Sequence, residues 1–231
     1  MTVDFSQLEK KLDIVFSNIN LLKQALTHRS YLNENKSWPL GHNERLEFLG
    51  DAVLELSISN QLYKKYPQLP EGLLTSLRAS LVNSNNLVKV AESLKLENFL
   101  LLSKGGKKDS DRSRTSFLAN ATEAVIGAIY LDQGFEGADK FINRIIMPDA
   151  DDILNNKLFK DAKSLFQEIS QERLGVTPIY QTLKAWGPDH DKHFVVGVFL
   201  AEEQIAEGEG ISKHEAEQNA ASQALKNKEW S

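Results

Sequence analysis

The sequence predicts a multi-domain protein: an all-α domain over residues 1–147, a linker over 148–159 and a small α+β domain over 160–228. In the first part, apolar residues recur every three or four positions, the spacing of helices with one buried face. In the last part the spacing changes, and three strand-like runs stand between two helical ones. A polar stretch with little periodicity separates the two patterns, as expected of a linker.

The helical pattern extends from Phe5 to about Ile146. Turn-forming residues interrupt it, and they predict loops at 33–39, 67–72 and 105–110. The α+β domain follows the order α-β-β-β-α. Its expected elements are helices at 161–173 and 213–228 and strands at 179–183, 194–200 and 204–208.

Composition excludes several classes of protein. The chain has 231 residues, 41% of them hydrophobic and 26% charged, which is typical of a folded globular protein. It contains no cysteine, so disulfides, thiolate nucleophiles and cysteine–zinc sites are excluded. The first residues lack the apolar core of a signal peptide, and no run approaches the ~20 apolar residues of a membrane span. We therefore expect a soluble cytoplasmic protein without a membrane partner.

Three acidic residues share one face of a predicted helix. Glu44, Glu47 and Asp51 are spaced i, i+3 and i+7, so their side chains line up along the helix. A solvated acidic face is the simplest interpretation. However, apolar residues surround these acids in the sequence, and repelling carboxylates edged by apolar side chains favour a bound cation.

A second acidic position lies in the apolar helix expected over 117–132. Glu123 is almost alone there, and burying an unpaired carboxylate costs several kcal/mol. Asn120, one turn earlier, shares its face. Oxygen ligands of this kind suit Mg²⁺, which proteins hold through a few carboxylates together with substrate phosphates. The pattern therefore indicates phosphoryl chemistry.

The segment HNERLEFLGD, from His42 to Asp51, resembles the signature of bacterial ribonuclease III, and the match continues as AVLELSISNQLYKKYP. ALTHRSY (25–31) and EAVIGAIYLDQGF (123–135) resemble the same family. The resemblance implies a homodimer that hydrolyses double-stranded RNA with Mg²⁺, for which Mn²⁺ can substitute. It implies products with 5′-phosphates, 3′-hydroxyls and two-nucleotide 3′ overhangs, and roles in ribosomal precursor processing and messenger turnover.

Carried over by position, the resemblance makes Glu47, Asp51 and Glu123 metal-site carboxylates, with Asp51 and Glu123 also catalytic. Glu44 and Glu71 match acidic positions that assist the cut or the dimer contacts around it. A metal-activated water attacks the phosphodiester, so no protein nucleophile is required.

Asn120 departs from the family, which normally has aspartate at this metal-ligand position. Its amide oxygen can still bind Mg²⁺, but without a negative charge it should hold the ion more weakly. Three interpretations stay open: a natural variant that cuts, a natural variant that mainly binds RNA, and a substitution that silences the enzyme. Intact acids elsewhere favour retained cutting.

Other residues have two interpretations each. Arg112 and Arg114 precede the second metal segment, where the family carries arginines, and they either contact an RNA phosphate or a carboxylate across the site or are merely solvated. His28 is expected to be a hydrogen-bonded structural histidine. Phe48 and the neighbouring leucines are expected in core or dimer packing, because they have helical spacing without a basic surround.

The C-terminal domain resembles a double-stranded RNA-binding domain, from its first helix through Gly187-Pro188-Asp189-His190 to the start of its last helix. The resemblance places Gln167 and His190 at minor-groove contacts and Lys213 and His214 near phosphates. Residues 160–231 nevertheless contain 8 Lys or Arg against 12 Asp or Glu. We therefore expect binding that is weaker and more sensitive to salt and pH than is usual for such domains.

The sequence thus favours an Mg²⁺-dependent double-stranded RNA endonuclease without a nucleotide cofactor. The alternative is a noncatalytic double-stranded RNA-binding protein on the same fold, because of Asn120. A third hypothesis, a helical nucleotide hydrolase, is disfavoured by the RNA-binding module.

Overall fold

The computed structural model describes residues 3–105, 111–155, 162–188 and 192–230. The chain divides into two compact units, Met1–Asn156 and Lys157–Ser231, which are described separately. The expected fold class is confirmed: the first unit is helical and the second is α+β. Among the described residues, no helix has the length and apolar character needed to cross a membrane.

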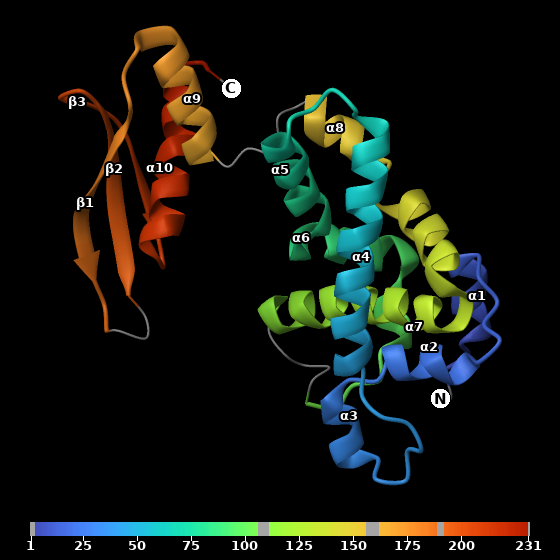
Figure 1. The fold of residues 1–231 in the computed structure, drawn as a ribbon. Coiled ribbons are helices and arrows are strands. Elements are labelled where there is room, and N and C mark those ends of the chain that lie inside the picture. The colour runs from blue at the N-terminus through green and yellow to red at the C-terminus, as the bar shows by residue number, and fades with distance from the viewer. Residues whose placement is uncertain (1–2, 106–110, 156–161, 189–191, 231) are drawn as a thin grey trace. The chain divides into compact units, whose positions relative to one another are not determined.

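The helical unit is built around the long helix α4, which crosses α7 (Figure 1). Before α4 come three short helices, and between α4 and α7 come two helices and a 3-10 turn. The elements are α1 (Ser6–Leu12), α2 (Ile19–Ala25), α3 (Arg29–Glu34), α4 (Glu44–Lys65), α5 (Glu71–Val82), α6 (Ser84–Leu94), η1 (Leu96–Phe99), α7 (Asp111–Ile145) and α8 (Asp149–Asn155). Inside α7, Gly134 has a φ of 72°, so two helical segments meet there at a kink.

Helices α4 and α7 touch backbone to backbone at a pair of glycines. A methyl group on Gly50 would overlap the carbonyl oxygen of Glu123, and one on Gly127 would overlap that of Leu46. Buried leucine, valine and alanine side chains on both helices pack around this crossing. Further along, Ser57 Oγ of α4 donates a 2.6 Å hydrogen bond to Asp139 of α7. The crossing brings two acidic helix faces together.

The linker predicted at 148–159 is wrong in its first half, where the chain forms α8 and belongs to the helical unit. Three aspartates in the first turn favour a helix start, because they face the positive end of the helix dipole. Asp151 also binds the end of α4, with 2.6 Å contacts to Lys65 Nζ and the Tyr66 hydroxyl. The rest of the predicted linker, 156–159, lies outside the described residues.

The second unit is an antiparallel sheet of order β1-β2-β3, with two helices on one face (Figure 1). Its core lies between sheet and helices and includes Phe166, Val198 and the alanine face of the last helix. The small alanines let this helix approach the sheet closely. The elements are α9 (Ala162–Leu174), β1 (Ile179–Trp186), β2 (His193–Leu200), β3 (Glu203–Gly210) and α10 (Lys213–Asn227).

Gly127→Ala should destabilise the protein by about 1–3 kcal/mol or more, because the added methyl group has no space at the crossing. Gly72→Ala in α5 is the matched control, since no atom beyond its own helical turn lies within 4 Å of the place that its added Cβ would occupy. Urea unfolding of the three proteins measures the difference. Equal destabilisation by the two substitutions would show that the crossing tolerates extra volume.

Candidate metal centre and RNA-binding module

The acidic residues of α4 and α7 come together where these helices cross. Glu44, Glu47 and Asp51 lie in the first half of α4, and Gly50 separates the last two. Asn120 and Glu123 lie on α7, before Gly127. Glu47, Asn120 and Glu123 are half-buried, whereas Glu44 and Asp51 are exposed. The predicted acidic face of α4 therefore meets the predicted acidic position of α7.

The electrostatics of the cluster show how close these groups are. The pKa of Glu123 is raised to about 7. Burial is the largest cause, and the negative charges of Asp51 and Glu47 contribute the rest. Burial also raises the pKa of Glu47, and the charges of Glu44 and Asp51 add to the effect, while a hydrogen bond with the Asn120 side chain opposes it. The neighbouring carboxylates thus disfavour ionisation of Glu47 and Glu123 unless a cation is present.

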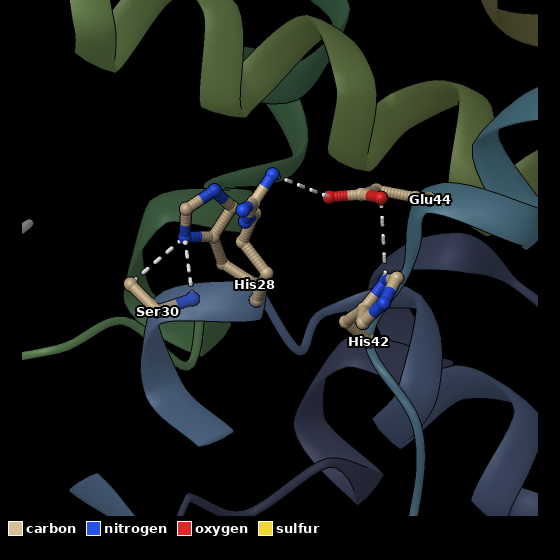
Figure 2. Close-up of polar contacts among 5 residues, drawn as sticks. His28, Ser30, His42 and Glu44 are labelled. Carbon is tan, nitrogen blue, oxygen red and sulfur yellow. Dashed lines mark hydrogen bonds and ion pairs between the residues drawn. The ribbon is translucent and has the colours of Figure 1, made fainter. Parts of the chain in front are cut away.

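Glu44 lies between two potential cations (Figure 2). Arg29 Nη1 is 3.6 Å from one of its carboxylate oxygens, and His42 Nδ1 is 3.8 Å from the other. Sequence reasoning missed both partners, because neither stands at helical spacing from Glu44. These contacts hold Glu44 toward α3 and the loop before α4, at the edge of the cluster.

The donor set fits a hydrated divalent cation. In the part of the chain that the structure describes, no three His, Asp or Glu side chains form a ready-made cage. Mg²⁺ does not require a complete cage, since it keeps several waters and takes one or two carboxylates. Oxygen atoms of these three acids and of Asn120 could hold such an ion.

Three predicted site residues lie outside this cluster. Glu71 is the first residue of α5, which follows the C-terminal end of α4, whereas the acid cluster lies in the first half of α4. Its carboxylate accepts a hydrogen bond from the Thr75 hydroxyl of its own helix. Arg114 of α7 forms a 2.5 Å ion pair with Glu97 of η1. Arg112 lies in α7 by its backbone, but its side chain is outside the described residues.

Phe48 is not a core residue, contrary to one of its two predicted roles. Its side chain is 80% exposed, because it projects from α4 away from α7. It borders a hollow of about 600 Å³ whose apolar lining includes Leu21, Leu46, Leu49 and Leu131. Dimer packing therefore remains the prediction for this surface.

The predicted RNA contacts of the second unit lie on its helices. Gln167 is exposed on α9, and Lys213 and His214 are exposed in the first turn of α10. Backbone N–H groups at a helix start are unpaired within the helix, so this end attracts phosphate. His190 lies outside the described residues.

Comparison with known proteins assigns both units. Residues 18–150 match the family model described as Ribonuclease-III-like, and residues 162–228 match the double-stranded RNA binding motif. A Ribonuclease 3 of Natranaerobius thermophilus is 49% identical over 218 residues, which cover 94% of each chain. That of Enterococcus faecalis is 45% identical over 222 residues, which cover 96% of each chain.

The chain belongs to the ribonuclease III family. The resemblance found in the sequence is confirmed, and the protein is an endoribonuclease of the class that acts on double-stranded RNA. A nuclease domain of ribonuclease III from Campylobacter jejuni is 41% identical, with a TM-score of 0.57 over 63% of this chain and 97% of that domain. Flexibility in a region involved in dimer formation is described for that domain.

Without metal, the protein should lose stability as the pH rises from about 4.5 to 7. In that range unfolded Glu123 releases its proton while the folded state, with its pKa near 7, retains it. Glu123→Gln stays neutral, so in EDTA at pH 8 it should be more stable than the parent protein by roughly 1–2 kcal/mol after allowance for partial solvent exposure.

At pH 5 this advantage should be much smaller, and denaturant unfolding at both pH values measures it. Glu136→Gln, at an exposed position of the same helix, is the control and should change little. A pH-independent effect of Glu123→Gln would contradict the assignment.

Proposed function

We propose that the protein cuts double-stranded RNA by metal-activated water at the α4–α7 crossing, with Mg²⁺ as the metal and Mn²⁺ as a substitute. The observation that carries this proposal is the half-buried, mutually repelling acid cluster on two rigid helices. The proposed products have 5′-phosphate and 3′-hydroxyl ends with two-nucleotide 3′ overhangs. The proposed role is ribosomal precursor processing and messenger turnover, in the cytoplasm where these RNAs are made.

Glu47, Asp51, Asn120 and Glu123 are the proposed metal ligands. When bound, a divalent ion would activate water and stabilise charge developing on the phosphate. Asp51 and Glu123 orient the reacting groups through their carboxylates. Asn120 contributes a neutral oxygen while its amide N–H groups remain available to Glu47. Glu44 and Glu71 are assigned to assisting the cut or the contacts between protomers.

The C-terminal module is proposed to hold the duplex by its shape. Gln167 and His190 would enter minor grooves, and Lys213 and His214 would meet the phosphates between them. Arg112 and Arg114 are proposed as contacts from the nuclease unit. For Arg114 this requires exchange of its Glu97 ion pair for an RNA phosphate.

Cleavage of a long, perfectly paired RNA with Mg²⁺ tests the proposal. The parent protein should release short duplexes with the stated ends, and Asp51→Asn or Glu123→Ala should slow the reaction by at least about 100-fold. EDTA should stop it. Glu92→Gln, at an exposed position of α6, is the matched control and should cut normally. Duplex binding without cutting, with either Mg²⁺ or Mn²⁺, would favour the noncatalytic alternative.

Asn120→Asp distinguishes the interpretations of this position. If the parent protein is a working nuclease, the added charge should lower the Mg²⁺ concentration needed for half-maximal cutting and raise the saturated rate only a few-fold. A protein that cuts only after this substitution is a binder as it stands. Cleavage rates across a series of Mg²⁺ concentrations decide between the two.

The exposed Phe48 and the apolar hollow beside it are proposed as the homodimer contact. A protruding aromatic ring next to an apolar hollow is self-complementary, as a two-fold interface requires. Phe48→Arg should therefore shift sedimentation toward the monomer. Tyr63→Arg, at a 75% exposed aromatic residue of the same helix, is the control. Unchanged dimerisation of Phe48→Arg would place the contact elsewhere.

A further inference from the structure

A small polar chamber lies beside Glu47, at the junction of α4, α7 and the segment that carries His28. Its volume is about 50 Å³, enough for at least one water molecule. Leu100, Leu102 and Phe117 form apolar walls. The polar lining consists of His28, Asn43, Glu44, Glu47 and Asn120. A water here would have several hydrogen-bond partners, and one of them is a proposed metal ligand.

The imidazole of His28 is held in one tautomer (Figure 2). The backbone N–H of Ser30 donates to its Nδ1 over 3.2 Å, and the Ser30 hydroxyl lies 2.8 Å from the same nitrogen. The hydroxyl oxygen in turn accepts from the backbone N–H of Ser103 at 3.2 Å. Because a backbone N–H can only donate, Nδ1 is the acceptor, and the neutral ring carries its proton on Nε2.

Packing fixes the ring next to the proposed metal ligands. The His28 ring lies 4.5 Å from that of Phe117, between centroids. Phe117 precedes Asn120 by three residues on α7, so both lie on the same helix face. Asn120 hydrogen-bonds Glu47. His28, Asn120 and Glu47 therefore meet around one chamber, although they come from three separate segments.

We infer that His28 is a positioning residue for Glu47. Its Nε2–H donates through water in the chamber to Glu47 and Asn120, and this contact orients the Glu47 carboxylate toward the metal. Hydrogen bonds behind metal ligands commonly change metal affinity by 10–100-fold. The inference rests on the proposed role of Glu47 as a ligand, and it gives His28 a role beyond capping α3.

Two substitutions separate the positioning role from the cap. His28→Asn keeps an oxygen near the place of Nδ1, so it can still accept from Ser30 N–H, but it does not reach the place of Nε2. His28→Gln extends an amide N–H toward the place of Nε2 and loses the cap. We expect His28→Asn to melt only slightly earlier than the parent protein, because it keeps the cap but loses the ring contact with Phe117, yet to bind Mg²⁺ about 10–100-fold more weakly. His28→Gln should melt earlier but keep Mg²⁺ affinity within a few-fold.

Isothermal titration of Mg²⁺ into the RNA-free protein is the main measurement, with kcat, KM and the Mg²⁺ dependence of cleavage beside it. Weaker Mg²⁺ binding by His28→Asn alone supports the inference. The reverse order, equal losses in both variants that follow their melting temperatures, or no loss in either would overturn it and leave His28 as a structural cap.

Glu47→Gln, measured in parallel, tells the two proposals apart. If it leaves Mg²⁺ binding and cleavage unchanged, the proposed metal centre fails, and the inference fails with it. If it abolishes both while neither His28 variant affects Mg²⁺ binding, only the role of His28 fails.

Discussion

The contact between Gly50 and Gly127 is the constraint on which the nuclease unit depends. Because neither helix has a side chain at this point, α4 and α7 meet at the distance of their backbones. Gly50 stands between Glu47 and Asp51, and Gly127 follows Glu123 by one turn, so the same contact that packs the core also gathers the acids. Side chains on crossing helices are held more rigidly than side chains on loops, which suits a site that must keep oxygen atoms in place for an ion.

At the proposed metal site, this arrangement would make stability and metal binding oppose each other. Burial and neighbouring charges raise the pKa of Glu123 to about 7, so the ionised cluster strains the fold when no cation is bound. Asn120 alters that balance in this chain. An aspartate at this position would add another repelling charge, whereas the amide hydrogen-bonds Glu47 and favours its ionised form. Compared with an aspartate, Asn120 therefore relieves repulsion in the free protein, and at the proposed site it would attract the ion more weakly.

The sequence predicted the fold class and the stripe of acids because both follow from helical spacing. The meeting of Glu123 with Glu47 and Asp51 came from family resemblance, since spacing within one helix says nothing about which helix it crosses. Phe48 shows the limit in another way: an apolar residue at helical spacing can project outward, and spacing alone does not distinguish a core residue from an exposed one. The aspartates of α8 resembled a linker by composition, whereas the contacts of Asp151 with Lys65 and Tyr66 and the burial of Ala150 attach that segment to the nuclease unit.

The net charge of the RNA-binding module is also a poor guide from sequence alone, because it does not show where the acids lie or what they contact. At the start of α10, Ser212 accepts a hydrogen bond from the backbone N–H of Glu215, and Glu215 accepts one from that of Ile211, so this acid caps the helix. Glu217 is paired with Lys163 at 2.6 Å. Gly208 of β3 packs against α10, so Glu207 and Glu209 on either side of it project from the opposite face of the sheet. Several acids that make the module negative are therefore neutralised, used as caps or turned away from the exposed start of α10. In the proposed contact, a duplex would meet the N–H groups of the helix start together with Lys213 and His214, so the local charge would govern the contact more than the domain total does.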